Sequence, residues 1–442
     1  MMRPQVRLAN RWTFPSPEIR PLANGASAWI YDLPGQHVAA FEVVMPSSLA
    51  LEPRAVEGVA TVALNAVDEG TVSNPDGRIA ELLELQGASL SGMANHNATR
   101  LSGDAPARRL VEVSRLLAEV ITEPEYAPDD VAHHVALQIA SHDSRAASPD
   151  AVARRTFRAA LHGDDAREGR PVAGTPSTLG AITPEDVVAW HQQRWLPSGS
   201  TFVLAGDLTG LDVDEALAPL GAWTGHGSQP EPTEADPLPP QVVLADMPEA
   251  VQATVQMGLL TPGRRHPQWA ALKLAGHAIT GAFASRLNLE LRERLGYTYG
   301  IQGGFSARRG DGQFTVGGSF RTEVAADAVV RMLDGVSLGS PFTDAEIADA
   351  REFLLGVAPL ANETAWDIAK QAAALAGAHE DPGFVNDHFA ELELPSAQDV
   401  TAAFREHVAS DALTVAISGR ASELEPALRA VGLEPVVVPA PR

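Results

Sequence analysis

The feature that most constrains the fold is a pattern that occurs twice, far apart in the chain. Residues 182–208 read ITPEDVVAWHQQRWLPSGSTFVLAGDL, and residues 394–420 read LPSAQDVTAAFREHVASDALTVAISGR. Each segment has a Thr or Ser followed three positions later by Asp, then an amphipathic helical pattern, a short loop and a β-rich run with Gly near its end. This shared order predicts an internal duplication. Its long period indicates two sister domains rather than a solenoid.

A Pro- and Glu-rich segment near the middle of the chain separates the two copies. Residues 225–240 read GHGSQPEPTEADPLPP and contain few apolar side chains. Such a segment buries too little surface to fold, and its prolines keep it extended. We therefore expect an N-terminal domain at residues 1–224, a linker at 225–240 and a C-terminal domain at 241–442.

The remaining patterns mix strands with long helices. The predicted strands are residues 26–34, 37–46, 251–260 and 312–320, and the predicted helices are residues 109–121 and 341–358. Strands joined by hairpins, with long helices set apart from them, favour an α+β fold over an alternating βαβ fold. We expect two homologous domains, each a mostly antiparallel β-sheet covered by helices in an α/β sandwich.

The composition excludes several classes of function. The formal net charge of −23 argues against a nucleic-acid partner, because phosphate binding requires clustered Lys and Arg. An acidic surface suits cationic peptides, although solubility alone also explains it. The absence of Cys excludes disulfides, thiolate zinc sites and a cysteine nucleophile. The sequence shows neither the apolar core of a signal peptide nor a long apolar span, so we expect no membrane association and a cytoplasmic location.

Residues 58–71, GVATVALNAVDEGT, combine helical apolar spacing with a preceding strand and a final Gly-Thr pair. Together with RERLGYTYG at residues 292–300, this order resembles the pitrilysin/insulinase family of zinc metallopeptidases, in particular its short two-domain branch that includes mitochondrial processing peptidase. The family motif is His-x-x-Glu-His. Its two imidazoles bind zinc from one helical face, and its Glu is the general base.

The resemblance implies that the metal motif is degenerate in this chain. In the family register, Thr61 replaces the first His, Leu64 replaces the Glu and Asn65 replaces the second His. Gln138 stands at the position of the later Glu ligand. All four side chains are uncharged, and Leu cannot accept a proton. We expect this chain to hold no metal and no other cofactor, and we expect zinc in a partner subunit.

The histidines offer no replacement site. His133 and His134 are adjacent, so on a helix their side chains point about 100° apart. His96 is interpreted as a surface or core residue, and His379 and His388 lack helical ligand spacing. No Gly-x-Ser-x-Gly, Walker or Rossmann signature occurs either.

The second half retains a segment that the family uses at its active site. We expect a helix that ends before Gly296, followed by a strand over residues 297–302. The resemblance implies that Arg292 and Tyr299 reach the zinc centre of a partner subunit, orient the substrate and stabilise the charge on its carbonyl. Tyr297 is the competing substrate-binding residue, because alternation puts it on the same side of the strand as Tyr299. A purely structural role also fits, since Arg in a last helical turn interacts with the helix dipole and strand aromatics usually pack.

These observations predict a non-catalytic, substrate-binding subunit of a heterodimeric zinc metalloendopeptidase. Its expected partners are a homologous zinc-bearing subunit and a peptide substrate. One alternative is a structural protein like the respiratory core proteins, which resemble this family. Another is an inactive homodimer that binds peptides.

Overall fold

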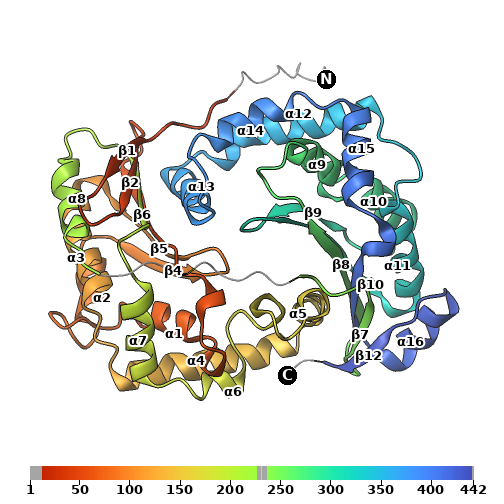
Figure 1. Ribbon diagram of the computed structural model, residues 1–442, viewed down its shortest axis with the longest axis horizontal. Coiled ribbons are helices and arrows are strands. Elements are labelled where there is room, and N and C mark those ends of the chain that lie inside the picture. Colours follow the sequence, from red (N-terminus) through yellow and green to blue (C-terminus); the bar gives the residue numbers. More distant parts are fainter. Residues whose placement is uncertain (1–11, 226–229, 231–235, 441–442) are drawn as a thin grey trace, which may run out of the picture.

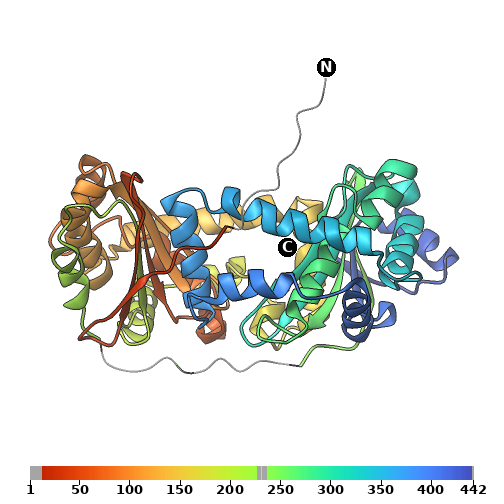
Figure 2. The same ribbon diagram turned by 90° about the horizontal axis from the view of Figure 1, so that it is seen from above.

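The computed structural model describes residues 12–225, 230 and 236–440, which form two six-stranded sheets covered by helices (Figures 1 and 2). The first sheet contains β1 (Glu18–Pro21), β2 (Ser27–Asp32), β3 (Val38–Met45), β4 (Ser89–Ala94), β5 (Thr99–Pro106) and β6 (Thr201–Gly206). The second contains β7 (Val242–Asp246), β8 (Gln252–Thr261), β9 (Gln302–Ala307), β10 (Gly312–Arg321), β11 (Thr414–Gly419) and β12 (Val436–Pro439). Most of the predicted linker, residues 226–229 and 231–235, lies outside the described residues.

The two sheets have equivalent topologies over five strands and differ at one edge, where β1 pairs antiparallel with β2 but β12 pairs in parallel with β7. Their strand orders are β1-β2-β6-β3-β5-β4 and β12-β7-β11-β8-β10-β9. β6 and β11 occupy the same place: each pairs in parallel with one neighbour, β2 or β7, and antiparallel with the other, β3 or β8. Antiparallel pairs predominate in both mixed sheets. The predicted α+β fold with two related halves is therefore confirmed.

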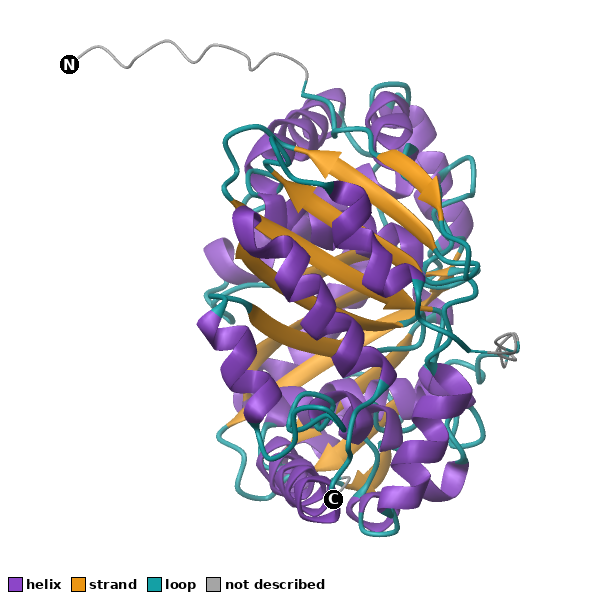
Figure 3. Cartoon of the chain, turned by 90° about the vertical axis from the view of Figure 1, so that its left-hand side faces the viewer, coloured by secondary structure: helices purple, strands orange, loops and turns teal. Residues whose placement is uncertain are grey.

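Helices cover both sheets (Figure 3). In the first half they are α1 (Val59–Asn65), α2 (Arg78–Leu85), α3 (Leu110–Thr122), α4 (Pro128–Ala146), α5 (Pro149–His162), α6 (Pro176–Leu179), α7 (Pro184–Arg194) and α8 (Val213–Gly221). In the second half they are α9 (Trp269–Gly276), α10 (Arg286–Asn288), α11 (Thr322–Val336), α12 (Asp344–Ala361), α13 (Ala365–Gly377), α14 (Phe384–Leu392), α15 (Ala397–His407) and α16 (Ala421–Ala430). Among the described residues, no helix is both long and apolar enough to cross a membrane.

The repeated segments fold as their patterns predict. α7 precedes β6, and α15 precedes β11. Thr183 and Asp186 form a reciprocal capping box at the start of α7, and Ser396 and Asp399 form the same box at the start of α15. In both, the Thr or Ser hydroxyl accepts a hydrogen bond from the Asp backbone amide, and the Asp carboxylate accepts one from the Thr or Ser backbone amide. These bonds satisfy donors that the first helical turn leaves free.

Each half of the chain also contributes a helix to the other half. α5 follows α4 and packs on β8 and β11 of the second sheet, while α13 follows α12 and packs on β3 and β6 of the first. The core on α13 includes Ala369 and Ala372 together with Trp29 and Val44 of the first sheet. The sequence boundary between the halves is therefore not the boundary between their hydrophobic cores.

Candidate functional site

A cavity of about 950 Å³ lies where the two halves meet. Its lining comes from α1, β4, α4 and α5, from the loop at residues 171–174, and from β8, β9 and β10. Figure 1 shows α1 and β4 on one side, β9 and β10 on the other, and α5 between them. β4 and β9 are sheet edges, each paired with a single neighbour. Both edges thus contribute residues to the cavity wall.

The helix predicted over residues 58–71 is shorter than expected, because α1 ends at Asn65. Gly58 caps its N-terminus with a φ of 104°, and a Cβ added there would lie 2.7 Å from the Leu179 side chain, so the position requires glycine. The carboxylate of Glu52 accepts hydrogen bonds from the Gly58 and Ala60 amides at 3.0 Å. Glu52 also forms a buried ion pair with Arg167, at 2.7 Å. Packing and this ion pair therefore fix the position of the helix without a metal.

The structure brings together the four positions of the degenerate motif. Thr61, Leu64, Asn65 and Gln138 all line the cavity. Leu64 is buried against β4, where a Cβ added to Gly92 would lie 2.6 Å from the Leu64 side chain. Oε1 of Gln138 is buried and has no hydrogen-bond partner. None of these side chains ionises near neutral pH, so they offer neither a general base nor a favourable zinc ligand set.

Two histidines near this region, His134 and His96, have different surroundings. Nε2 of His134 lies 2.7 Å from Glu69. His96 lies in the turn between β4 and β5 rather than on a strand, and burial, followed by the charge of Arg167, lowers its pKa to about 3. Within the described part of the chain, no group of three or more His, Asp or Glu residues could hold a metal ion.

The segment that carries Arg292 differs in part from its prediction. Arg292 lies in a π-helical segment, Leu289–Arg294, and Gly296 follows the helix with a φ of 63°, as expected for a helix stop. The predicted strand over residues 297–302 is wrong, because β9 begins only at Gln302. The physical reason lies in Asn288, whose side chain accepts a hydrogen bond from the Ile301 amide at 2.8 Å and donates one to the Ile301 carbonyl at 3.1 Å.

The two tyrosines do not face the same side, so that prediction is also wrong. The hydroxyl of Tyr297 donates a hydrogen bond to Asp327 at 3.1 Å, and this bond raises the pKa of Tyr297. Tyr299 is 98% exposed. Tyr297 is therefore anchored within its own half, whereas Tyr299 is available to another molecule.

Arg292 lies beside an exposed aromatic ring. Its guanidinium is 3.5 Å from the centroid of Phe283, which is 68% exposed, and its Nε is 3.2 Å from Glu293. Neither Arg292 nor Tyr299 is among the described residues that line the cavity. Within one chain, the structure does not bring this pair to the four degenerate positions.

The cavity also contains four arginines and a histidine that the sequence analysis missed. They are Arg145 and His142 of α4, and Arg154, Arg155 and Arg158 of α5. Arg155 Nη1 lies 3.1 Å from His142 Nε2, and burial, followed by the charge of Arg155, lowers the pKa of His142. The sequence shows the spacing of these arginines on a predicted helix. It does not show that the side of the helix that carries them faces the cavity.

Comparison with known proteins gives this arrangement a family context. Residues 181–354 match the family described as "Peptidase M16 inactive domain". Proteins named "uncharacterized zinc protease" from Mycobacterium bovis and Mycobacterium tuberculosis are 25% identical over 335 residues, which are 73% of this chain and 75% of theirs. The corresponding Mycobacterium leprae protein is 30% identical over 194 residues, which are 42% of each chain.

Solved structures share the fold over nearly the whole chain. A peptidase M16 inactive domain from Pseudomonas fluorescens matches with a TM-score of 0.81 and 21% identity, covering 91% of this chain and 98% of its own. A protease from Helicobacter pylori matches with a TM-score of 0.82 and 15% identity, covering 92% and 100%. A chain of complex III2 from Candida albicans matches with a TM-score of 0.78 and 13% identity, covering 92% and 97%. The predicted resemblance to this peptidase family is confirmed.

Proposed function

We propose, on the premise that this chain is related to the M16 peptidases, that it is the non-catalytic subunit of a heterodimeric zinc metalloendopeptidase. Its match to the family's inactive domain agrees with a non-catalytic role. In the proposed assembly a homologous subunit holds the zinc, and this chain encloses the peptide and supplies Arg292 and Tyr299 to the partner's metal centre. A guanidinium and a phenol are suitable donors to the oxyanion that develops during peptide hydrolysis.

The observation that carries the proposal is the separation of two sets of residues. Four uncharged side chains line the cavity at the positions of the metal motif, whereas Tyr299 projects away from its own chain with 98% of its surface exposed. Tyr299 is exposed, and Arg292 stacks on the exposed ring of Phe283, so both are available for contact with a second subunit.

Peptide is the ligand that the cavity geometry supports best. The edge strand β4 contributes Gly92, Met93 and Ala94 to the lining. An edge strand presents unpaired backbone groups, to which an extended peptide adds as a further strand.

The test is reconstitution with a homologous chain from the same genome that contains His-x-x-Glu-His. Each chain is purified alone, its zinc content is measured, and cleavage of a quenched fluorescent peptide library is recorded for each chain and for the mixture. We expect zinc only in the partner and peptidase activity only in the mixture. Zinc-dependent cleavage by this chain alone would refute the proposal.

Variants then test the residue assignments. Arg292→Ala removes one proposed oxyanion donor, so kcat of the complex should fall about 10²–10³-fold. Tyr299→Phe should also lower kcat. Tyr297→Phe is the matched control, because its hydroxyl bonds to Asp327 within its own half, and kcat should not change. If complexes carrying Arg292→Ala or Tyr299→Phe assemble and retain full kcat, the proposed in-trans role is wrong.

Two other functions remain as alternatives. The shared fold with a chain of complex III2 is compatible with a scaffolding role, which co-purification with membrane cytochromes would favour. A homodimer on gel filtration that binds peptides without a zinc-bearing partner would favour an inactive peptide-binding protein.

A further inference from the structure

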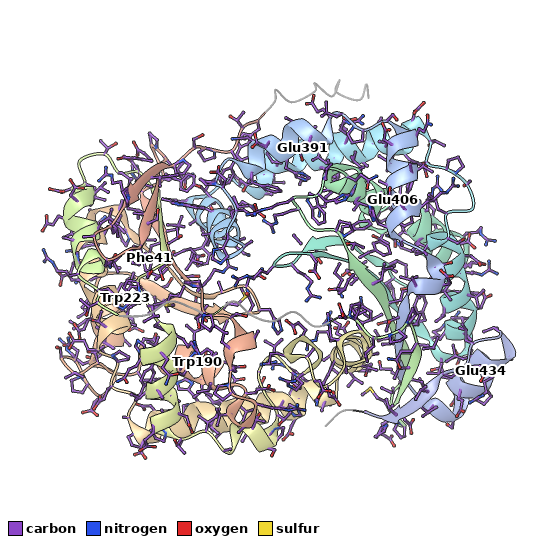
Figure 4. All side chains as sticks on the ribbon, in the orientation of Figure 1. Phe41, Trp190, Trp223, Glu391, Glu406 and Glu434 are labelled. Atoms are coloured by element: carbon purple, nitrogen blue, oxygen red, sulfur yellow. The ribbon has the colours of Figure 1, made fainter. Side chains whose placement is uncertain are left out.

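The charge of the cavity is opposite to that of the chain. The protein has a formal net charge of −23. Yet the described residues that line the cavity include Arg145, Arg154, Arg155 and Arg158 and no Asp or Glu. Exposed acids such as Glu391, Glu406 and Glu434 lie at the periphery of the second half (Figure 4). A cationic cavity within an anionic molecule attracts anions locally that the whole molecule would repel.

Arg158 is the cavity arginine whose charge is least neutralised by the described residues around it. Among the described residues it forms no ion pair, and its Nε is buried without a hydrogen-bond partner. Burial lowers its pKa, and the nearby charges of Arg167 and Arg155 lower it further. A partly buried cation close to other cations is unfavourable unless a counter-ion neutralises it.

The other arginines are partly balanced. Arg154 forms an ion pair with Asp150 one turn earlier on α5. Arg155 contacts His142, and the charge of Asp164 acts on it from outside the cavity lining. The positive charge that remains is therefore concentrated at Arg158 and Arg145, on the end of α4 and the inner face of α5.

The uncharged part of the lining adds groups that suit a peptide. Five amide side chains line the cavity from both halves: Asn65, Gln138, Gln256, Gln302 and Gln313. Amides donate to carboxylates and pair with peptide backbone, and the sheet edges β4 and β9 offer further backbone groups. The volume of about 950 Å³ is at the upper end of single-ligand pockets and accommodates several extended residues.

We infer that this cavity selects acidic peptide segments, with Arg158 as the principal carboxylate-binding residue and the other cavity arginines reinforcing it. The inference rests on the proposed function in taking peptide as the ligand of the cavity. It requires neither zinc nor a partner subunit, because every group involved belongs to this chain.

The experiment measures direct binding to the isolated full chain. Three fluorescein-labelled 12-residue peptides are compared by anisotropy: alternating Thr and Glu, alternating Thr and Gln, and alternating Thr and Lys. We expect the Glu peptide to bind at least about tenfold more tightly than the Gln peptide, and any binding of the Lys peptide to the acidic outer surface to be unaffected by Arg158→Gln. Raising the salt concentration should weaken the Glu peptide and not the Gln peptide, because ionic strength screens charge pairs.

Variants assign the effect to the cavity. Arg158→Gln should weaken the Glu peptide about tenfold and leave the Gln peptide unchanged, a difference that general structural damage would not produce. Arg154→Gln should have a smaller effect, because Asp150 already neutralises that charge. Arg429→Gln is the distal control: Arg429 lies on α16, forms an ion pair with Glu425 at 3.1 Å, and should not affect binding.

Equal affinities for the Glu and Gln peptides, or an Arg158→Gln variant that binds like the unchanged protein, would overturn the inference. If inorganic phosphate competes as effectively as the Glu peptide, the site binds small anions and the peptide assignment is wrong. These outcomes are separate from those of reconstitution: a complex that cleaves peptides regardless of charge retains the proposed function without acidic selection. A chain that prefers acidic peptides but never supports cleavage retains only the selection.

Discussion

α5 and α13 occupy equivalent places in the duplicated architecture, yet their side chains serve different purposes. Each follows a long helix and packs on the sheet of the opposite half. α13 buries Ala369, Ala372 and Ala373 completely and contributes no described residue to the cavity. α5 packs Phe157 and Leu161 on the second half, and its arginines line the cavity together with Phe157.

This difference separates the requirements of the fold from those of the ligand. The shared placement needs only an apolar face of suitable size, which both helices have. The arginines of α5 lie outside its apolar cluster, so these positions are free to carry charge. The duplication therefore determines where both helices pack, and of the two only α5 adds arginines to the cavity lining.

The largest expected effect comes from giving α13 the charge that α5 carries. Ala372→Arg places a large cation in a fully buried contact with the first sheet, within an apolar cluster that includes Trp29 and Val44. We expect the free energy of unfolding to fall by about 3–5 kcal/mol. Thermal denaturation measures the loss, and Lys370→Arg, on an exposed position of the same helix, is the control without effect. A stable Ala372→Arg protein would mean that α13 does not pack as described.

The second test restores ligands to α1 and α4. Thr61→His, Asn65→His and Gln138→Glu together recreate a zinc ligand set at positions that already line one cavity. Leu64 is retained because it packs on Gly92. We expect one zinc per chain by elemental analysis and, with zinc at about 1,000 times its Kd, stabilisation by about 4 kcal/mol. The variant with only the two histidines should bind more weakly. A triple variant without zinc would contradict the motif register.

The third test uses the end of α5. Nε2 of His162 lies 3.0 Å from Arg308, and burial, followed by the charges of Arg308 and Arg158, lowers its pKa to about 4. The unfolded chain, with an ordinary pKa of about 6.5, binds the proton first as pH falls. His162 thus favours folding above pH 6.5, and this contribution, of order 2–3 kcal/mol, is lost as pH falls from 6.5 to 4.

His162→Gln keeps a hydrogen-bond acceptor for Arg308 but does not titrate. Its unfolding free energy, measured by denaturant titration, should therefore change less between pH 6.5 and 4 than that of the unchanged protein. Identical pH profiles for the two proteins would show that the pKa of His162 is the same in the folded and the unfolded chain.

The smallest expected effect is a gain in stability. Arg158→Gln removes a largely buried cation that faces other cations, so we expect stabilisation by about 1 kcal/mol in the absence of ligand, seen as a rise of about 2–4 °C in Tm. A cation that served mainly to hold the structure together would give a lower Tm. The same substitution should weaken binding of the acidic peptide, so stability and binding should change in opposite directions.

Much of the fold could be predicted from local patterns. Capping pairs such as Thr183 with Asp186 set where helices begin, and apolar runs predicted β3 and β8. The exchange of α5 and α13 could not be predicted, because an apolar helical face indicates that a helix packs but not on which sheet.

The site was predicted unevenly for a similar reason. The motif register predicted that Thr61 and Gln138 lie close together although they are far apart in sequence, and both line one cavity. The prediction of a strand beginning at Tyr297 was wrong because the Asn288 side chain binds the Ile301 backbone. The alternation of apolar and polar residues carries no information about such a contact. The arginines of α5 were missed because their importance depends on the tertiary direction of a helix face.

The exchanged helices have a consequence for how the polypeptide is held together. Because α5 lies on β11 and α13 lies on β3, the covalent connection between the halves is not what keeps them in place. Protease cleavage between residues 225 and 240 should leave a nicked protein whose two fragments elute as one species and separate only on denaturation. The same interlocking implies that either fragment, made alone, would lack a helix its sheet requires and would need its counterpart present while it folds.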